Sequence, residues 1–531
     1  MTEESNYWKR LAKRRLSRRR LLVGAMGVGA GLTAASLVGC QGGEEGTPGT
    51  PGATPEGTPG AQRPGERAPD VTPYRPRDQL DPVKEGSRGG ILRWYGYDAL
   101  PPDTFDPHQG QFGPVYSMHS VVFSKVLQYD DIPNGVIVTD LAVSMPEVVD
   151  KTKYVIKIRD GVRFHDTERA RKYPGLAGRQ LTGEDVKYMI ERQMNEASPK
   201  AGRYYRKSQW QTVDKIEVGP DPLTVTITTK QPTAPFIHFL ADSNALIVAK
   251  ELVDEATDLM ITEGDNTDPM VGTGPFYLDQ YITAQVVKLR RNADWFAKDD
   301  LAGQGLPDRP IVDGYDALWP VQDDTATEAA FKSKQIDGTG YVDPRNTYRI
   351  RDETGCEVDR AVTSGFVNSR FLIADSDRAK SPWKDVRLRK AISLAADRVR
   401  LGAQMFGEGF YVLNPPVGQA ITRWALPYDQ FITKPGYRYT REEREQDITE
   451  ARRLWEAAGG SAAVGSVDAV VAGIPDYIPR VWPQFQKMLS DHLGFEIKGH
   501  VDPSGYTELD LCLLQKSCVF GLGFDNGWND L

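Results

Sequence analysis

Few side chains of this chain are spaced for catalysis. The pair His165-Asp166 could act as an acid and a base, but neighbours on a strand point to opposite faces, so a residue at a hairpin end is the better interpretation. The sequence has neither the Gly-x-Ser-x-Gly nor the His-Glu-x-x-His motif of common hydrolases. Its six histidines are scattered, at positions 108, 119, 165, 238, 492 and 500. No catalytic residue is predicted, and a hydrolase remains only as an alternative.

A glycine-rich segment, Val271-Gly272-Thr273-Gly274-Pro275, could be mistaken for a phosphate-binding loop. It lacks the Gly-Lys-Ser/Thr that reaches the phosphates in nucleotide-binding loops, so we interpret it as a turn. The segment therefore predicts no nucleotide cofactor.

The cysteines show no metal-binding spacing. Cys356, Cys512 and Cys518 contain no Cys-x-x-Cys pair, so no metal site is predicted. Cys512 and Cys518 could form a disulfide, but small buried thiols are the favoured interpretation.

The charge is distributed unevenly. The formal net charge is −8, with +6 in residues 1–20 and −14 after residue 40. An acidic body without a long basic run does not favour nucleic-acid binding.

The N-terminal segment has the order of a secretory signal. Residues 9–20 hold eight Lys or Arg, 21–38 are uncharged, and small residues lead to Cys40. The segment around Arg18 and Arg19 resembles a twin-arginine export motif, and residues 37–40 resemble the bacterial lipobox, which implies a lipid on Cys40. An uncleaved membrane anchor is the alternative. Both interpretations place the body outside the cytoplasm.

Residues 41–88 are predicted to form a flexible tether. They contain a Thr-Pro-Gly repeat, and residues 41–65 alone hold eight glycines and five prolines, a composition that cannot bury enough apolar surface to fold. The body then starts near residue 89 and is too long for a single core, so at least two lobes are expected.

Patterns along the body predict alternating strands and helices, and hence an α/β fold with mixed sheets. Asp160-Gly161 favours a hairpin turn between apolar alternations at 154–158 and 162–164. Thr182 and Asp385 are predicted helix caps. The other expected strands are 91–97, 223–229, 286–289, 467–471, 496–500 and 519–524, and the other expected helices are 116–127, 447–458 and 481–492.

Several segments, taken in order, carry recognisable signatures: Gly89-Gly90-Ile91-Leu92, Phe105-Asp106-Pro107, Ile158-Arg159-Asp160-Gly161-Val162-Arg163-Phe164-His165-Asp166, Leu181-Thr182-Gly183-Glu184-Asp185-Val186, Gly272-Thr273-Gly274-Pro275-Phe276, Arg291-Asn292-Ala293-Asp294-Trp295 and Asp385-Val386-Arg387-Leu388-Arg389-Lys390-Ala391-Ile392. Together they resemble the family 5 extracytoplasmic solute-binding proteins of peptide, nickel and related ABC importers. The resemblance implies a type II periplasmic-binding-protein-like fold with a hinge between two lobes and an extra subdomain. The expected divisions are a signal in 1–40, the linker 41–88, a lobe I core in 89–118 and 214–330, the extra subdomain in 119–213, and lobe II in 331–531.

The resemblance also implies a ligand site. Tyr97, Gln111 and Phe112 fall where the family contacts its ligand from the first lobe. Trp528 matches the family's Gly-Trp, and Asp530 or Asp525 matches the acidic residue that binds the ligand's ammonium group. The arginine with which dipeptide binders hold a carboxylate is missing from residues 473–477, and nearby Arg480 is expected to be a solvated charge. A cationic hydrophilic solute is therefore expected.

The family comparison further implies a monomer without cofactors, tethered by lipid to the outer face of the bacterial cell membrane, that serves ABC permease subunits. A sensor without transport is a further alternative. Family members continue past the ligand motif, so the second lobe is expected to be truncated and the chain to be a fragment.

Overall fold

The structure is a computed structural model that describes residues 88–95, 105–109, 113–131, 134–198, 204, 206–254, 259–260, 270–282, 285–300, 309–318, 324–340, 343–358, 365–371, 381–407, 411, 413, 425–473, 477–502 and 520–526. Two separate hydrophobic cores lie in this part of the chain. The first gathers residues between 105 and 317, and the second gathers residues between 383 and 497. Each core has its own sheets and helices.

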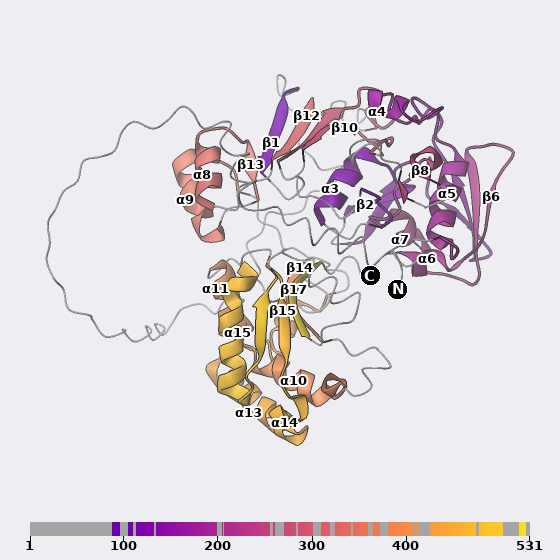
Figure 1. The fold of residues 1–531 in the computed structure, drawn as a ribbon. Coiled ribbons are helices and arrows are strands. Elements are labelled where there is room, and N and C mark those ends of the chain that lie inside the picture. Colours follow the sequence, from indigo (N-terminus) through magenta and orange to yellow (C-terminus); the bar gives the residue numbers. More distant parts are fainter. Residues whose placement is uncertain are drawn as a thin grey trace, which may run out of the picture. The chain divides into compact units, whose positions relative to one another are not determined.

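The first core contains a five-stranded mixed sheet with the order β10-β11-β12-β1-β13 (Figure 1). β1 runs parallel to β12 and β13, whereas β11 is antiparallel to both β10 and β12. The strand predicted at 286–289 is confirmed as β11, and residues 91–95 of the strand predicted at 91–97 form β1, while residues 96 and 97 lie outside the described residues. The five strands are β1 (Ile91–Tyr95), β10 (Phe276–Ile282), β11 (Val286–Arg291), β12 (Gly314–Leu318) and β13 (Gly338–Thr339).

An antiparallel four-stranded sheet, ordered β4-β5-β7-β6, packs in the same core. Along β7 every second residue is buried, as the alternation at 223–229 predicts. β5 lies in the expected extra subdomain (119–213) and pairs with β7, which lies in the expected lobe I core (214–330). β13 pairs with β1 of lobe I, although β13 lies beyond the expected limit of that lobe at 330. The strands are β4 (Glu147–Val149), β5 (Lys153–Lys157), β6 (Val213–Val218) and β7 (Thr224–Thr229).

The hairpin predicted at Asp160-Gly161 is wrong in its pairing. Gly161 does have a positive φ of 74°, so the chain turns there. β5 pairs with β4 and β7, however, and the residues after the turn bond elsewhere: the Phe164 N–H donates to Arg179 and the Leu181 N–H donates to Val162. A partner distant in sequence replaces the local one.

Helix α5 (Gly183–Met194) begins where its cap predicts. Thr182 and Asp185 form a reciprocal capping box, and the apolar face of the helix is buried. Helix α3 (Gly113–Val122), by contrast, ends five residues before the predicted limit of 127. The Val122 carbonyl accepts a hydrogen bond from Gly274 at 2.8 Å, a tertiary contact that the local pattern could not reveal.

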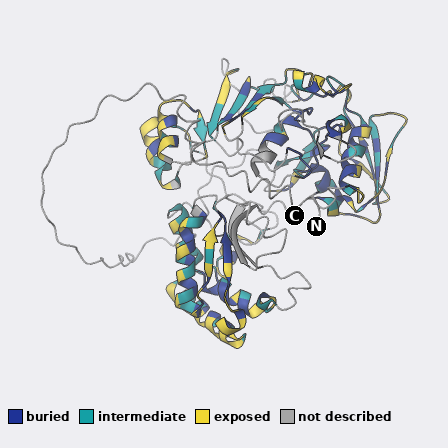
Figure 2. Cartoon of the chain, in the orientation of Figure 1, coloured by how far each residue is buried: buried dark blue, intermediate teal, exposed yellow. Residues whose placement is uncertain are grey.

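Shorter elements complete this half of the described chain. Two small antiparallel pairs join β2 to β3 and β8 to β9. Many residues of the helices α8 and α9 are exposed (Figure 2). The elements are β2 (Leu127–Asp131), β3 (Val136–Thr139), α4 (Glu168–Arg171), α6 (Lys207–Trp210), α7 (Phe236–Ala241), a 3-10 turn (Lys250–Leu252), β8 (Val253–Asp254), β9 (Leu259–Met260), α8 (Asp324–Lys332) and α9 (Pro344–Thr354).

The second core is built on a four-stranded sheet, ordered β14-β17-β15-β16, with helices α10, α13 and α15 (Figure 1). Asp385 caps α10, as predicted, by accepting from the Arg387 N–H. Helix α13 starts six residues before the predicted 447, because Thr440 and Glu443 form a capping box there. The strands predicted at 467–471, 496–500 and 519–524 are confirmed as β15, β16 and β17.

The elements of this second half are β14 (Gly365–Phe371), a 3-10 turn (Pro382–Lys384), α10 (Val386–Ala395), α11 (Arg398–Phe406), α12 (Tyr428–Phe431), α13 (Arg441–Ala457), α14 (Gly460–Val464), β15 (Asp468–Val471), α15 (Tyr477–Leu493), β16 (Lys498–Val501) and β17 (Phe520–Asn526). None of the helices within the described ranges has both the length and the apolar content that a membrane span requires.

Candidate ligand-binding region

One edge of the second sheet gathers the strand ends that precede the predicted ligand residues. β15 runs parallel to both β16 and β17, so the carboxyl ends of these three strands meet at the same edge. β14 is antiparallel and begins there, with Gly365 opposite Asn526. Open α/β sheets bind ligands outside the carboxyl ends of their strands. This edge is therefore the candidate binding edge.

Asp525 is the predicted ligand residue whose backbone the structure places. It is the next-to-last residue of β17 and pairs with Phe366 of β14, at the candidate binding edge. Trp528 and Asp530 follow β17 directly in the sequence but lie outside the described residues. The other predictions outside the described residues are Tyr97, Gln111, Phe112, Arg18, Arg19, Cys40, Cys512 and Cys518.

Helix α15 follows β15 and carries Arg480 in its first turn. Arg480 is exposed, with 39% of its side chain accessible, as expected for a solvated charge. Its guanidinium also lies 3.8 Å from the carboxylate of Asp343, the N-cap of α9. A hydrogen bond from Arg345 is the main cause that lowers the pKa of Asp343, and Arg480 adds a smaller attraction.

On the first core, a buried turn lies between the segments that hold Tyr97 and Gln111. Asp106 in this turn accepts hydrogen bonds from the His108 N–H at 3.0 Å and from the Gln109 amide at 2.9 Å. Arg192 of α5 binds both carboxylate oxygens of Asp106, at 3.1 and 2.5 Å. Both charged side chains are almost fully buried, so the turn is fixed to α5.

The electrostatics of this pair favour the charged forms. Burial alone would raise the pKa of Asp106, but the attraction of Arg192 and His108 outweighs it and holds the pKa below its ordinary value. The partners are 86 residues apart in the sequence. Sequence reasoning identified the Phe105-Asp106-Pro107 turn but missed Arg192, because a single sequence gives no signal for such a distant contact.

His165 is a structural residue and does not form an acid–base pair with Asp166. The His165 ring is buried, with Nδ1 accepting from the Gly272 N–H at 3.3 Å and Nε2 donating to the Gly274 carbonyl at 3.0 Å. Burial lowers the pKa of His165 to about 4. Asp166 is exposed and pairs with Arg171 at 2.9 Å.

The glycine-rich segment packs against the end of α3. A Cβ on Gly272 would lie 2.1 Å from the Val122 carbonyl oxygen, and one on Gly274 would lie 2.4 Å from that of Val121. Glycine is therefore required for the close approach of two backbones. These contacts fit the interpretation as a turn and leave no reason to assign phosphate binding.

In the part of the chain that the structure describes, no group of three or more His, Cys, Asp and Glu side chains is placed to hold a metal. Cys356 is a partly buried free thiol.

The family model for bacterial extracellular solute-binding proteins, family 5, matches residues 136–506, well over half of the chain. The chain therefore belongs to this family.

Curated relatives agree with the family. The chain is 28% identical over 369 residues to the dipeptide-binding protein of Escherichia coli K12, covering 67% of this chain and 62% of the relative. It is 23% identical over 347 residues to the oligopeptide-binding protein AppA of Bacillus subtilis, and the match covers 65% of this chain and 56% of the relative. The chain spans about six tenths of the length of these relatives.

Solved structures share the fold. The structure of DppA from Helicobacter pylori with the peptide STSA gives a TM-score of 0.62 at 20% identity, covering 83% of this chain and 79% of that one. The structure of AppA from Bacillus subtilis with a nonapeptide gives a TM-score of 0.62 at 18% identity, and the match covers 83% of this chain and 80% of that one. The expected fold class, a mixed α/β periplasmic-binding-protein-like fold, is confirmed.

Proposed function

We propose that this chain is the solute-binding receptor of an ABC importer, which captures a peptide-like or other hydrophilic solute between two lobes and passes it to the permease. The family membership supports this proposal. So do relatives that are named for dipeptides and oligopeptides. The role is binding without catalysis, with a hydrolase or a sensor without transport as alternatives.

The observation that carries the proposal is the convergence of strand ends at the candidate binding edge. Asp525 lies on β17 at this edge, and Trp528 and Asp530 follow it in the chain. A carboxylate can pair with the ammonium group of a solute, and the face of a tryptophan can cover that cation. We assign these residues, with Tyr97, Gln111 and Phe112 from the first lobe, to the solute site, and we expect a cationic solute.

We further propose that the receptor is exported through the twin-arginine signal at Arg18 and Arg19 and anchored by a lipid on Cys40. The linker at 41–88 then holds the body near the permease, which raises the effective concentration of receptor at the membrane. This arrangement places a monomeric receptor on the extracytoplasmic face of the cell membrane.

A thermal-shift screen of peptides, sugars and metal ions on the full chain, followed by calorimetry of each hit, tests this function. A cationic peptide is expected to raise the unfolding temperature without being consumed. Product formation that persists after repurification would refute the receptor role.

Two variants test the cation site. Asp525→Asn and Asp530→Asn are each compared with Asp468→Asn, an exposed carboxylate at the opposite end of β15. One of the first two is expected to weaken binding of the cationic hit about tenfold or more, whereas the control leaves it unchanged. Equal affinity in all three variants would eliminate the cation site and leave the receptor role standing.

A further inference from the structure

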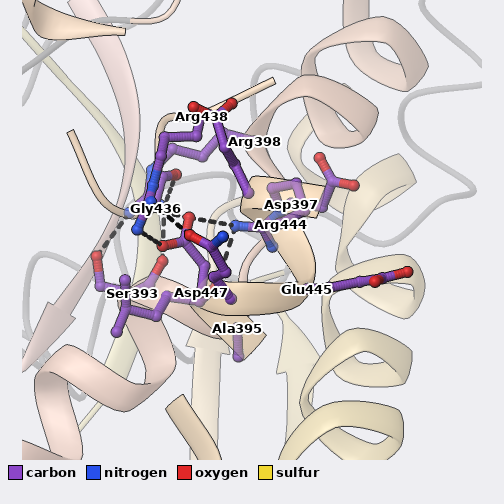
Figure 3. A network of polar contacts seen from close by, with 12 residues as sticks. Ser393, Ala395, Asp397, Arg398, Gly436, Arg438, Arg444, Glu445 and Asp447 are labelled. Carbon is purple, nitrogen blue, oxygen red and sulfur yellow. Dashed lines mark hydrogen bonds and ion pairs between the residues drawn. The ribbon is translucent and has the colours of Figure 1, made fainter. Parts of the chain in front are cut away.

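Three arginines surround one buried carboxylate in the second core (Figure 3). Arg398 begins α11, Arg438 precedes α13, and Arg444 lies in the N-terminal part of α13. Asp447, the carboxylate, lies one turn further along α13 and is 1% exposed. The four side chains come from three segments that meet at the end of α10.

Asp447 is fully engaged by this arrangement. It accepts from the Gly436 N–H at 2.8 Å and from Arg438 Nη2 at 2.5 Å, and it lies 3.5 Å from Arg444 Nη1. It supplies one negative charge against three positive ones.

Asp397 and Glu445, which Figure 3 also labels, have their partners elsewhere. Asp397 caps α11 by accepting from the Arg400 N–H at 3.1 Å, and Glu445 pairs with Arg441 at 3.1 Å. Within the described residues, neither forms an ion pair with the three arginines. The cluster therefore keeps a surplus of positive charge.

Two of the three arginines donate hydrogen bonds to backbone carbonyl groups. Arg398 Nη1 donates to the carbonyls of Ser393 at 2.7 Å and Gly436 at 2.9 Å, and Arg444 Nη1 donates to Leu394 at 3.1 Å. Cations at the last turn of a helix such as α10 interact well with its carbonyl groups. Carbonyls are neutral, however, so they bind N–H groups without cancelling the charge.

Several guanidinium nitrogens have no acceptor in the described part of the chain. They are Nε of Arg438 and both Nε and Nη2 of Arg444, all of them buried. Arg444 as a whole is only 9% exposed. Buried polar groups normally have a hydrogen-bond partner, and an ionised group needs one most. Burial, with repulsion from Arg444 as a smaller cause, lowers the pKa of Arg398 against the attraction of Tyr437 and Asp447.

We propose that this arginine cluster (Arg398, Arg438 and Arg444) binds a small oxoanion of the phosphate class. Such an anion would accept hydrogen bonds from the free nitrogens of Arg438 and Arg444 and balance the charge, and guanidinium groups suit oxoanions by their planar fork. The side chain of Arg438 is 20% exposed, and its movement would admit the anion. The site uses none of the residues assigned to the solute.

Inorganic phosphate is the probe. The full chain without solute is unfolded thermally in rising phosphate, against potassium chloride of equal ionic strength. Phosphate is expected to raise the unfolding temperature by about 3 °C or more and to saturate. Arg444→Gln and Arg438→Gln are each expected to abolish this rise.

Arg453→Gln is the matched control, because Arg453 lies on the same helix, is exposed and pairs with Glu450. This variant must keep the full response to phosphate. If Arg444→Gln does not fold, Arg438→Gln and a calorimetric titration of the unaltered chain decide the question. A response no larger than that of chloride, or one equal in all variants, overturns the proposal. Peptide binding is measured separately, so failure of one site does not imply failure of the other.

Discussion

The two cores differ in whether their buried positive and negative charges balance. In the first, Asp106 and Arg192 form a one-to-one pair in which both carboxylate oxygens are bound. In the second, two of the three arginines, Arg438 and Arg444, pair with Asp447, and buried guanidinium nitrogens of these two have no acceptor among the described residues. In the balanced pair the two charges cancel, and the pair fixes the position of a turn. The unbalanced cluster keeps a net positive charge, which would attract a ligand of opposite charge.

The largest effect is expected from breaking the balanced pair. Arg192→Met leaves the Asp106 carboxylate buried without its partner and should lower the free energy of unfolding by about 3–5 kcal/mol. Urea unfolding at pH 7 measures this loss. Lys187→Met on the same helix, where the side chain is 30% exposed, is the control and should change little. A loss below about 1 kcal/mol would show that the pair does not hold the turn.

Acid is expected to weaken the first core next. His165 keeps a pKa of about 4 in the folded chain, against 6.5 when unfolded, so only the unfolded chain takes up a proton between these values. The contribution of His165 to the free energy of unfolding is complete above pH 6.5 and falls by up to about 3 kcal/mol as the pH drops to 4. His165→Gln should reduce the slope of stability against pH in that window. An unchanged slope would contradict the buried neutral histidine.

The unbalanced cluster should respond more weakly. Asp447→Asn keeps an acceptor for Gly436 but removes the charge that faces Arg438 and Arg444, and should lower the free energy of unfolding by about 2 kcal/mol. Urea unfolding beside Arg192→Met compares the two regions directly. If Asp447→Asn costs more than Arg192→Met, the second core depends on its carboxylate more than the first does, and the contrast fails.

Local sequence patterns predicted the elements that local chemistry determines. The capping residues Thr182 and Asp385 and the alternation of β7 act within a few residues of the chain, and all three were confirmed. The hairpin at Asp160-Gly161 failed because residues 162–164 pair with residues 179–181. The turn itself was local, but its partner was not.

The candidate site could be predicted only through the family resemblance. Asp525 lies at the candidate binding edge because β15 and β17 are parallel, so that their carboxyl ends meet, a relation between distant segments. Arg192 and Arg444 were missed for the same reason, since a lone arginine on a helix is usually a solvated charge. Charge pairing across long separations is set by packing, which no local pattern contains.

The position of β17 has a consequence for the order in which the chain can fold. This strand comes last among the described elements, yet it lies between β14 and β15, pairing with residues about 50 to 160 positions earlier in the chain. During synthesis the second sheet must wait for residues 520–526 to leave the ribosome, while β14 and β15 lack the strand that joins them. Contacts over such long separations form slowly, so β14 and β15 remain without the strand that joins them until late in synthesis.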